Sequence, residues 1–467
     1  MTIFEKLREY GYETLPEDFY KYIKLWRSWY DSNVKNFHNY RVYNGQKYVK
    51  CKRSTLGMGK KVCEDWANLL MNERVHITLE GEKEQEFFDN VLSKNNFEEK
   101  ANEMQEMKTA LGTSAYVLRV SGMSITESGD VIGADSLKMD YVTAENIYPL
   151  SWENGIINDC AFATQKTNSG RNYLYLRIDK RNEQGNYDIH NLLFEITTGG
   201  IGKEISLDTI PELASVPPII HTNSNIPQFV IDKPNIANNV DNNYPMGISV
   251  FANGIDELKG VDIAYDSYVN EFNLGKKRIM VKPEAMRNPM TDESYFDTND
   301  VTFYVLPEDG ADSSVKEIDM NLRTAEHNTG IQDMLNLLSM KCGFGEKYYK
   351  FDGGSVATAT QVVSDNSVLF RTIKKHEIIL ERALVQLARL ILHMGNIYMN
   401  ANLNEDVEIT IDFDDSIIED KNAEFERDSR LVSMGVLGLD EFRAKWLNED
   451  IETARASLPK MESLVVE

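Results

Sequence analysis

The sequence has few cysteines and histidines, and their spacing argues against a disulfide framework or a local metal site. Four cysteines stand far apart among 467 residues with no CxxC pair, which predicts reduced thiols. The seven histidines are scattered, and no two stand four residues apart beside a third ligand. We therefore expect neither a structural zinc nor any other cofactor.

Long hydrophobic runs are also missing. No apolar stretch approaches the roughly 18 residues that a membrane-spanning helix needs. The first residues, MTIFEKLREYGYE, lack the apolar core of a signal peptide. The sequence thus predicts a protein with no membrane partner that is made and stays in the cytoplasm.

Basic residues are fewer than acidic residues in this chain. The chain has 50 lysines and arginines against 74 aspartates and glutamates, a net charge of −24. This balance argues against a protein that grips nucleic acid over a wide basic face. It does not exclude a protein along which nucleic acid slides without sticking.

Motifs for chemistry are scarce, which favours a structural protein over an enzyme. There is no nucleophile elbow or dinucleotide fingerprint, and GMGKK at 57–61 lacks the spacing of a phosphate loop. One carboxylate cluster stands out, formed by Asp412, Asp414, Asp415, Glu419 and Asp420. A metal-dependent nuclease or hydrolase using Asp412, Asp414 and Glu419 is therefore an alternative. A half-buried strand with one solvated face explains the same pattern.

The first half of the chain changes from helical to strand periodicity. Apolar residues recur at helical spacing in four segments, at 16–30, 57–73, 83–94 and 97–111. Alternating patterns then predict strands at 115–121, 138–143, 157–165, 173–179, 189–197 and 203–207. The glycines of ITTGGIGKEI predict a hairpin turn. Prolines between Pro211 and Pro245 mark a loop or domain boundary. The helical segments followed by a run of strands predict the α+β fold class.

The second half is predicted to be mainly helical. A helix over 249–274 and a returning helix over 322–340 bracket a small α/β insert at 279–319 with strands at 278–282 and 301–306. A proline-free stretch over 356–399, interrupted only by Gly395, predicts a rod of roughly 65 Å. A strand at 407–415 and two or three short helices follow.

The helix at 249–274 has a strongly acidic face, formed by Asp256, Glu257, Asp262, Asp266 and Glu271. An ordinary solvated face explains it, and so does a surface that repels a polyanion. A basic run, Lys276-Lys277-Arg278, comes directly after this helix.

The order of these elements resembles that of the portal proteins of tailed bacteriophages, in particular the type found in long-tailed phages of Gram-positive hosts. The resemblance covers nearly the whole chain. It rests on YPMGISVFANGIDELKGVDIAYDSY (244–268), FDGGSVATATQVVSDNSVLFRTIKKHE (351–377) and SMGVLGLDEFRAKWL (433–447).

The resemblance implies a portal architecture with an α/β wing, a two-helix stem, a small α/β clip, a tunnel loop, a very long helix and a short helical crown. Residues 1–112 would be the helical part of the wing and 113–247 its β-rich part. The stem helices would lie in 248–275 and 321–340, with the clip at 276–320 between them. The remaining parts would be the tunnel loop at 341–357, the long wing helix at 358–402, and the wing strand and crown at 403–467.

The resemblance also implies a function and partners. A ring, typically of twelve subunits, would sit at one capsid vertex of the virion after assembly in the host cytoplasm. Double-stranded DNA would pass through it non-specifically during packaging and ejection. Its partners would be the major capsid protein and scaffold, the terminase large subunit and head-completion or adaptor proteins; another virion scaffold or connector protein is the alternative.

Candidate site residues follow from these roles. The tunnel loop would touch DNA through Lys341, Phe344, Lys347, Tyr348, Tyr349 and Lys350. The channel-facing stem residues would be Asp256, Glu257, Lys276, Lys277 and Arg278. Packing of the loop's aromatic rings between subunits is an equal alternative to contact with DNA.

Overall fold

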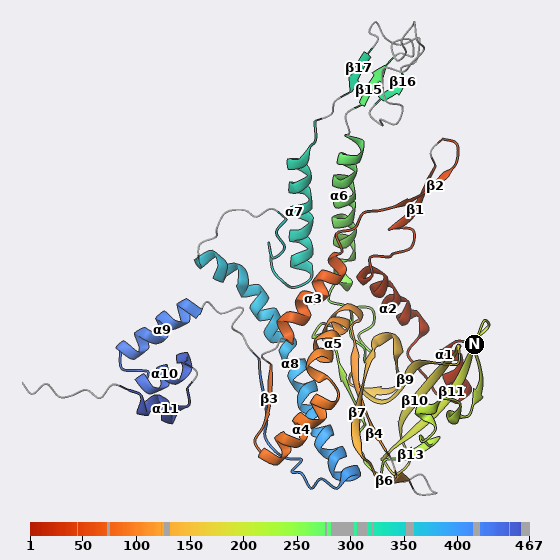
Figure 1. Cartoon of the computed structure of the whole chain (residues 1–467), viewed down its shortest axis with the longest axis vertical. Coiled ribbons are helices and arrows are strands. Elements are labelled where there is room, and N and C mark those ends of the chain that lie inside the picture. The colour runs from red at the N-terminus through yellow and green to blue at the C-terminus, as the bar shows by residue number, and fades with distance from the viewer. Residues whose placement is uncertain are drawn as a thin grey trace, which may run out of the picture.

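A computed structural model shows an elongated molecule with a mixed helix and sheet body and a two-helix projection (Figure 1). It describes residues 1–43, 45–71, 75–122, 124–125, 131–275, 278–281, 303–305, 315–318, 321–351, 359–413, 421–447 and 449–458. Residues of the predicted insert, tunnel loop and crown that fall between or beyond these ranges lie outside the described part.

Five helices precede the main sheets; the last four match the predicted helical segments closely, whereas the first was not predicted. They are α1 (Ile3–Glu9), α2 (Glu17–Tyr30), α3 (Met58–Leu70), α4 (Glu82–Lys94) and α5 (Phe97–Leu111). In α2 the stripe of Phe19, Ile23 and Trp26 is buried, as expected of an amphipathic helix. Helix α5 ends at Gly112, whose φ of 85° is the left-handed conformation that glycine adopts without strain.

The N-terminal part also contains strands that the sequence patterns did not predict. A hairpin of β1 (Asn39–Tyr43) and β2 (Tyr48–Lys52) projects from the body, alongside α6 in the view of Figure 1. Strand β3 (His76–Leu79) pairs with β18 (Ile409–Asp412), some 330 positions later in the chain. Residues 1–112 are therefore not purely helical.

Two antiparallel sheets form the β-rich part of the body. The larger has the order β12-β11-β10-β9-β8, with β13 on β11, and the smaller has the order β14-β4-β7. Their strands are β4 (Ser114–Ser121), β7 (Ser136–Thr143), β8 (Ile147–Glu153), β9 (Ile156–Asn168), β10 (Arg171–Arg181), β11 (Tyr187–Thr197), β12 (Gly200–Ile205), β13 (Ile219–His221) and β14 (Phe229–Asp232). Strands β5 (Ser124–Ile125) and β6 (Val131–Gly133) form a separate pair. The predicted hairpin is β11–β12, with Gly200 at a φ of 103°.

The projection consists of α6 (Ile255–Leu274) and α7 (Thr324–Lys341), which pack against each other. Helix α6 begins six residues later than predicted, because 249–254 form a turn and a 3-10 helix at Ala252–Gly254. Beyond α6 and α7 lies a small sheet of β15 (Arg278–Val281), β16 (Phe303–Val305) and β17 (Val315–Ile318), with the order β16-β15-β17. The first two of these strands coincide with the predicted strands of the insert.

Helix α8 (Ala359–Met399) has 41 residues and runs through the body, packing on α3, α4 and β14. Leucines and isoleucines from Leu380 to Leu392 are fully buried, which identifies α8 as the central helix of the core. Gly395 permits close contact with α4, since a Cβ there would lie 2.7 Å from Cζ of Phe87. Three short helices close the chain, α9 (Lys421–Ser433), α10 (Leu439–Leu447) and α11 (Ile451–Ala456).

No helix in the part of the chain that the structure describes is long and apolar enough to span a membrane.

A buried polar cluster connects α5, β14 and α8. Lys108 Nζ lies 3.1 Å from Asp232 Oδ2, and both side chains are almost completely inaccessible to solvent. Gln105 Nε2 donates to the same carboxylate oxygen at 2.9 Å. On α8, His376 Nδ1 accepts the backbone N–H of Asn235 at 3.1 Å. Burial lowers the pKa of His376 to about 3, and the positive charge of Lys108 contributes.

We expect replacement of Lys108 by Met to lower the free energy of unfolding by about 3–5 kcal/mol. The substitution leaves the Asp232 carboxylate buried without its counter-charge. Urea denaturation of the monomeric chain would measure the loss. The double variant K108M/D232N, which removes both charges, should recover most of the stability. A single variant as stable as the wild type would contradict this view.

His376 should make the protein less stable in acid. The unfolded chain binds a proton on this histidine near pH 6.5, whereas the folded protein does so only near pH 3. Between these values the unfolded state binds more protons, so stability falls as pH falls. From pH 7 to pH 5 we expect a loss of about 2 kcal/mol that is absent in His376→Asn. The exposed His76→Asn is the control and should behave like the wild type.

Candidate functional site

The loop that follows α7 folds back onto its own helix. Two glycines, Gly343 and Gly345, adopt φ values of 88° and 87°, which allow the chain to reverse direction. Gln332 on α7 then binds the backbone of the loop where the loop returns to the helix. Its Nε2 donates to Tyr349 O at 2.7 Å, and its Oε1 accepts from Phe351 N at 2.7 Å. The loop is thus fixed by its backbone as far as residue 351, and 352–357 lie outside the described residues.

The aromatic rings of the loop pack against α3. Trp66 is fully buried, and its Nε1 donates to Cys342 O at 3.0 Å. Phe344 stacks on Trp66 with ring centroids 4.8 Å apart, and Tyr348 stacks on Phe344 at 4.4 Å. Tyr349 meets the edge of Phe344 at 5.5 Å. Burial raises the pKa of Tyr348 to about 12, so its hydroxyl is neutral at physiological pH.

The six predicted loop residues therefore fall into two groups. Phe344 is 1% exposed and Tyr349 is 9% exposed, so both rings belong to the core of their own chain. An exposed surface is formed by Lys341, Lys347, Tyr348 and Lys350. Because a buried ring has no face to offer, we restrict the expectation of DNA contact to this second group. Neither contact with DNA nor packing between subunits describes Phe344, because its ring stacks on Trp66 of the same chain.

The predicted acidic face of α6 is largely used inside the chain. Asp262 accepts the backbone N–H of Leu56 at 2.9 Å, and Asp266 accepts that of Ser54 at 2.8 Å. His38 Nδ1 accepts the N–H of Val34, so its Nε2 carries the proton and donates to Asp262 at 2.9 Å. These two carboxylates hold a segment from the N-terminal part, and they do not form a surface that repels a polyanion.

Glu271 is likewise paired. Its carboxylate receives Arg323 Nε at 3.0 Å and Nη2 at 2.8 Å, which joins the end of α6 to the start of α7. This bidentate contact lowers the pKa of Glu271 to about 2. Among the five acidic residues of α6, Asp256 is exposed and Glu257 is half-buried, and Asp256 pairs with Lys259 at 2.8 Å.

The basic run after α6 is described only at its last residue. Lys276 and Lys277 lie outside the described residues. Arg278 is the first residue of β15.

Only one of the five carboxylates in the predicted metal site lies among the described residues. Asp412 ends β18 opposite His76, and its side chain is exposed. The other carboxylates of the predicted cluster, Asp414, Asp415, Glu419 and Asp420, lie outside the described residues. Within the described ranges, no three histidine, cysteine or carboxylate side chains gather as metal ligands would.

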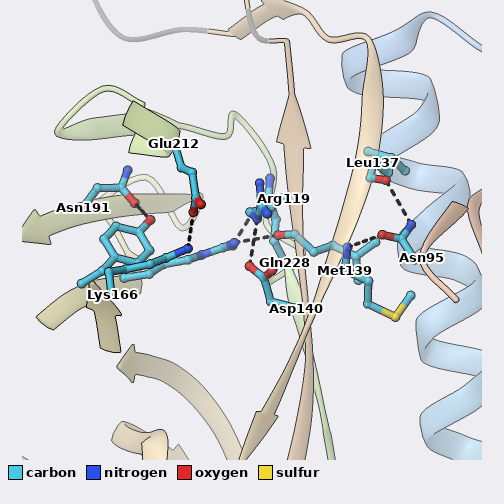
Figure 2. Close-up of polar contacts among 12 residues, drawn as sticks. Asn95, Arg119, Leu137, Met139, Asp140, Lys166, Asn191, Glu212 and Gln228 are labelled. Carbon is cyan, nitrogen blue, oxygen red and sulfur yellow. Dashed lines mark hydrogen bonds and ion pairs between the residues drawn. The ribbon is translucent and has the colours of Figure 1, made fainter. Parts of the chain in front are cut away.

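A cavity of about 850 Å³ between the two sheets was not predicted from the sequence. Figure 2 shows its polar side chains directed at one another: Arg119 Nε donates to Asp140 at 2.9 Å, and Lys166 Nζ to Glu212 at 2.6 Å. None of its lining residues is a histidine or a cysteine. The distant strands that form it, such as β4, β7 and β9, gave no local signal of a shared space. In these two ion pairs the charges neutralise each other, and neither pair combines a nucleophile with a base.

Comparisons with known proteins identify the family. A solved structure, the "Neck of native GTA particle computed with C12 symmetry", matches with a TM-score of 0.41 and 10% identity, covering 83% of this chain and 88% of that one. No curated protein sequence matches. The model of the family "Phage portal protein, SPP1 Gp6-like" matches residues 16–454. The chain therefore belongs to the SPP1 Gp6-like family of phage portal proteins.

Proposed function

We propose that the chain assembles into a closed ring of about twelve copies at one capsid vertex, and that double-stranded DNA passes through the ring during packaging and ejection. The observation that supports this most directly is the match to the portal family over residues 16–454. Portal proteins are structural components of the virion, and this role agrees with the scarcity of motifs for chemistry.

The arrangement of elements supports a division of roles. Helices α6 and α7, which project from the body, would be the stem, and the sheet β15–β17 beyond them would be the clip (Figure 1). The clip would receive the terminase during packaging and adaptor proteins afterwards. The body would be the wing, which contacts the capsid protein and scaffold. Helices α9–α11 would form the crown.

The charge of the chain suits a conduit. Each phosphate that a protein neutralises releases counterions and strengthens binding, which slows the passage of DNA. A net charge of −24 keeps general affinity for DNA low. A few exposed loop side chains, namely Lys341, Lys347, Tyr348 and Lys350, would make weak contacts that do not depend on base sequence.

The first expected outcome is a ring. Twelve copies of 53.4 kDa correspond to about 640 kDa, and a ring requires two different complementary faces on each subunit. Negative-stain electron microscopy and mass photometry of the purified chain should show particles of this size with a central hole. Monomers or dimers alone at high protein concentration would contradict the proposal.

The loop offers a second test. Changing Lys341, Lys347 and Lys350 to Gln should leave stability and ring formation unchanged but reduce the amount of DNA packaged or retained per capsid. The control is Phe344→Ala, which should lower the free energy of unfolding by about 3–5 kcal/mol because it removes the ring stacked on Trp66. If the lysine variant blocks ring formation instead, the loop functions in subunit packing.

A further inference from the structure

The hairpin β1–β2 is exposed on both faces, although such a two-stranded ribbon is only marginally stable without a partner. Exposed fractions reach 46% for Val42, 57% for Tyr43 and 71% for Tyr48. Val42 stands opposite Val49 on one face, and Tyr43 stands opposite Tyr48 on the other. Apolar side chains on both faces indicate that the hairpin has a partner in the assembled protein.

The second face of the hairpin is positively charged. Arg41 stands directly opposite Lys50, and Lys52 follows on the same face. Like charges at directly opposed positions destabilise a ribbon unless an anionic group neutralises them. Among the described residues, neither Arg41 nor Lys50 has a carboxylate within ion-pair distance.

This charge is local to one segment of an acidic chain. No aspartate or glutamate occurs between Asp31 and Glu64. The same segment contains Lys35, Arg41, Lys47, Lys50, Lys52, Arg53, Lys60 and Lys61. A segment of this composition favours an acidic partner.

The base of the hairpin is held firmly on α6. His38 and Leu56 both donate to Asp262, Ser54 donates to Asp266, and the N–H of Arg53 donates to His38 O at 2.8 Å. The direction of the hairpin is therefore fixed by α6. In Figure 1 it stands on the side of α6 that faces away from α7.

Helix α7 presents a stripe with the complementary properties. Glu326, Asp333, Leu337 and Met340 are all exposed. They stand at i, i+7, i+11 and i+14, so they share one side of the helix. The stripe is acidic at its start and apolar at its end, and within the described residues neither Glu326 nor Asp333 has an ion-pair partner.

We propose that the β1–β2 hairpin of one copy docks on the α7 stripe of the adjacent copy, with Arg41 and Lys50 facing Glu326 and Asp333. This inference rests on the proposed ring. A closed ring joins two different faces of the same chain, and the hairpin and α7 lie on opposite sides of α6 in Figure 1. Tyr43 and Tyr48 on the cationic face of the hairpin, together with Leu337 and Met340 on α7, supply apolar area for the contact to bury.

A copy of the same chain fits the hairpin better than DNA does. DNA would neutralise the cationic face but would leave the rings of Tyr43 and Tyr48, which lie on that same face, without an apolar contact, because the phosphates of a duplex offer no apolar surface. The adjacent stem offers carboxylates together with Leu337 and Met340. The contact would also brace the stem, since the base of the hairpin is already bonded to α6 of its own copy.

Charge reversal tests the contact. In R41E/K50E, half-assembly into rings should require at least about a tenfold higher protein concentration by mass photometry, because two attractive pairs become repulsive. E326K/D333K should show the same defect. The combined variant R41E/K50E/E326K/D333K should assemble at nearly the wild-type concentration, since each copy contributes both faces. The control K94E/K203E makes the same change in net charge on exposed lysines of α4 and β12.

The outcomes separate this contact from the ring itself. If the wild type forms rings and R41E/K50E assembles like the control, the hairpin contact is refuted and the portal proposal stands. If R41E/K50E forms rings normally but no longer shifts a 60-base-pair duplex that the wild type shifts, the hairpin contacts DNA and the inference is wrong. A wild type that forms no ring contradicts the proposed function itself.

Discussion

The buried indole of Trp66 is the contact on which the arrangement of the loop and the central helix depends. It donates to the backbone of the loop at Cys342, stacks on Phe344 and meets the ring of His376 on α8 at 4.9 Å. One side chain of α3 thereby fixes where α7 ends and how α8 crosses the body. This packing buries the rings of Phe344 and Tyr349. The exposed surface of the loop therefore consists mainly of lysines.

The long helices and about half of the described strands were predictable because their apolar periodicity is strong and local. Helix α8 lacks proline over its whole length, and α5 ends at a glycine that suits a left-handed cap. The hairpin β1–β2 was missed because burial creates the alternating pattern by which strands are recognised, and both of its faces are exposed. Strand β3 was missed because its partner β18 is distant in the chain.

The candidate site was predictable as a segment but not as a surface. Helical spacing places Asp262 and Asp266 on a polar face. It cannot show whether their carboxylates are hydrogen-bonded to water or, as the structure has it, to the backbone N–H groups of Leu56 and Ser54. In the same way, nothing near Phe344 in the sequence indicates Trp66, because Trp66 and Cys342 are 276 positions apart. Tertiary contacts of this range decide which of several polar or aromatic side chains are free to act.

His376 divides α8 into two arms of unequal length. About 26 Å of helix precede His376 and about 35 Å follow it, at 1.5 Å per residue. Between the two arms, His376 packs against Trp66. A rotation of a rigid rod by about 5° at this point would displace its far end, near Met399, by about 3 Å. Because the leucines from Leu380 to Leu392 on the longer arm are fully buried, such a displacement requires the surrounding core to move with the helix.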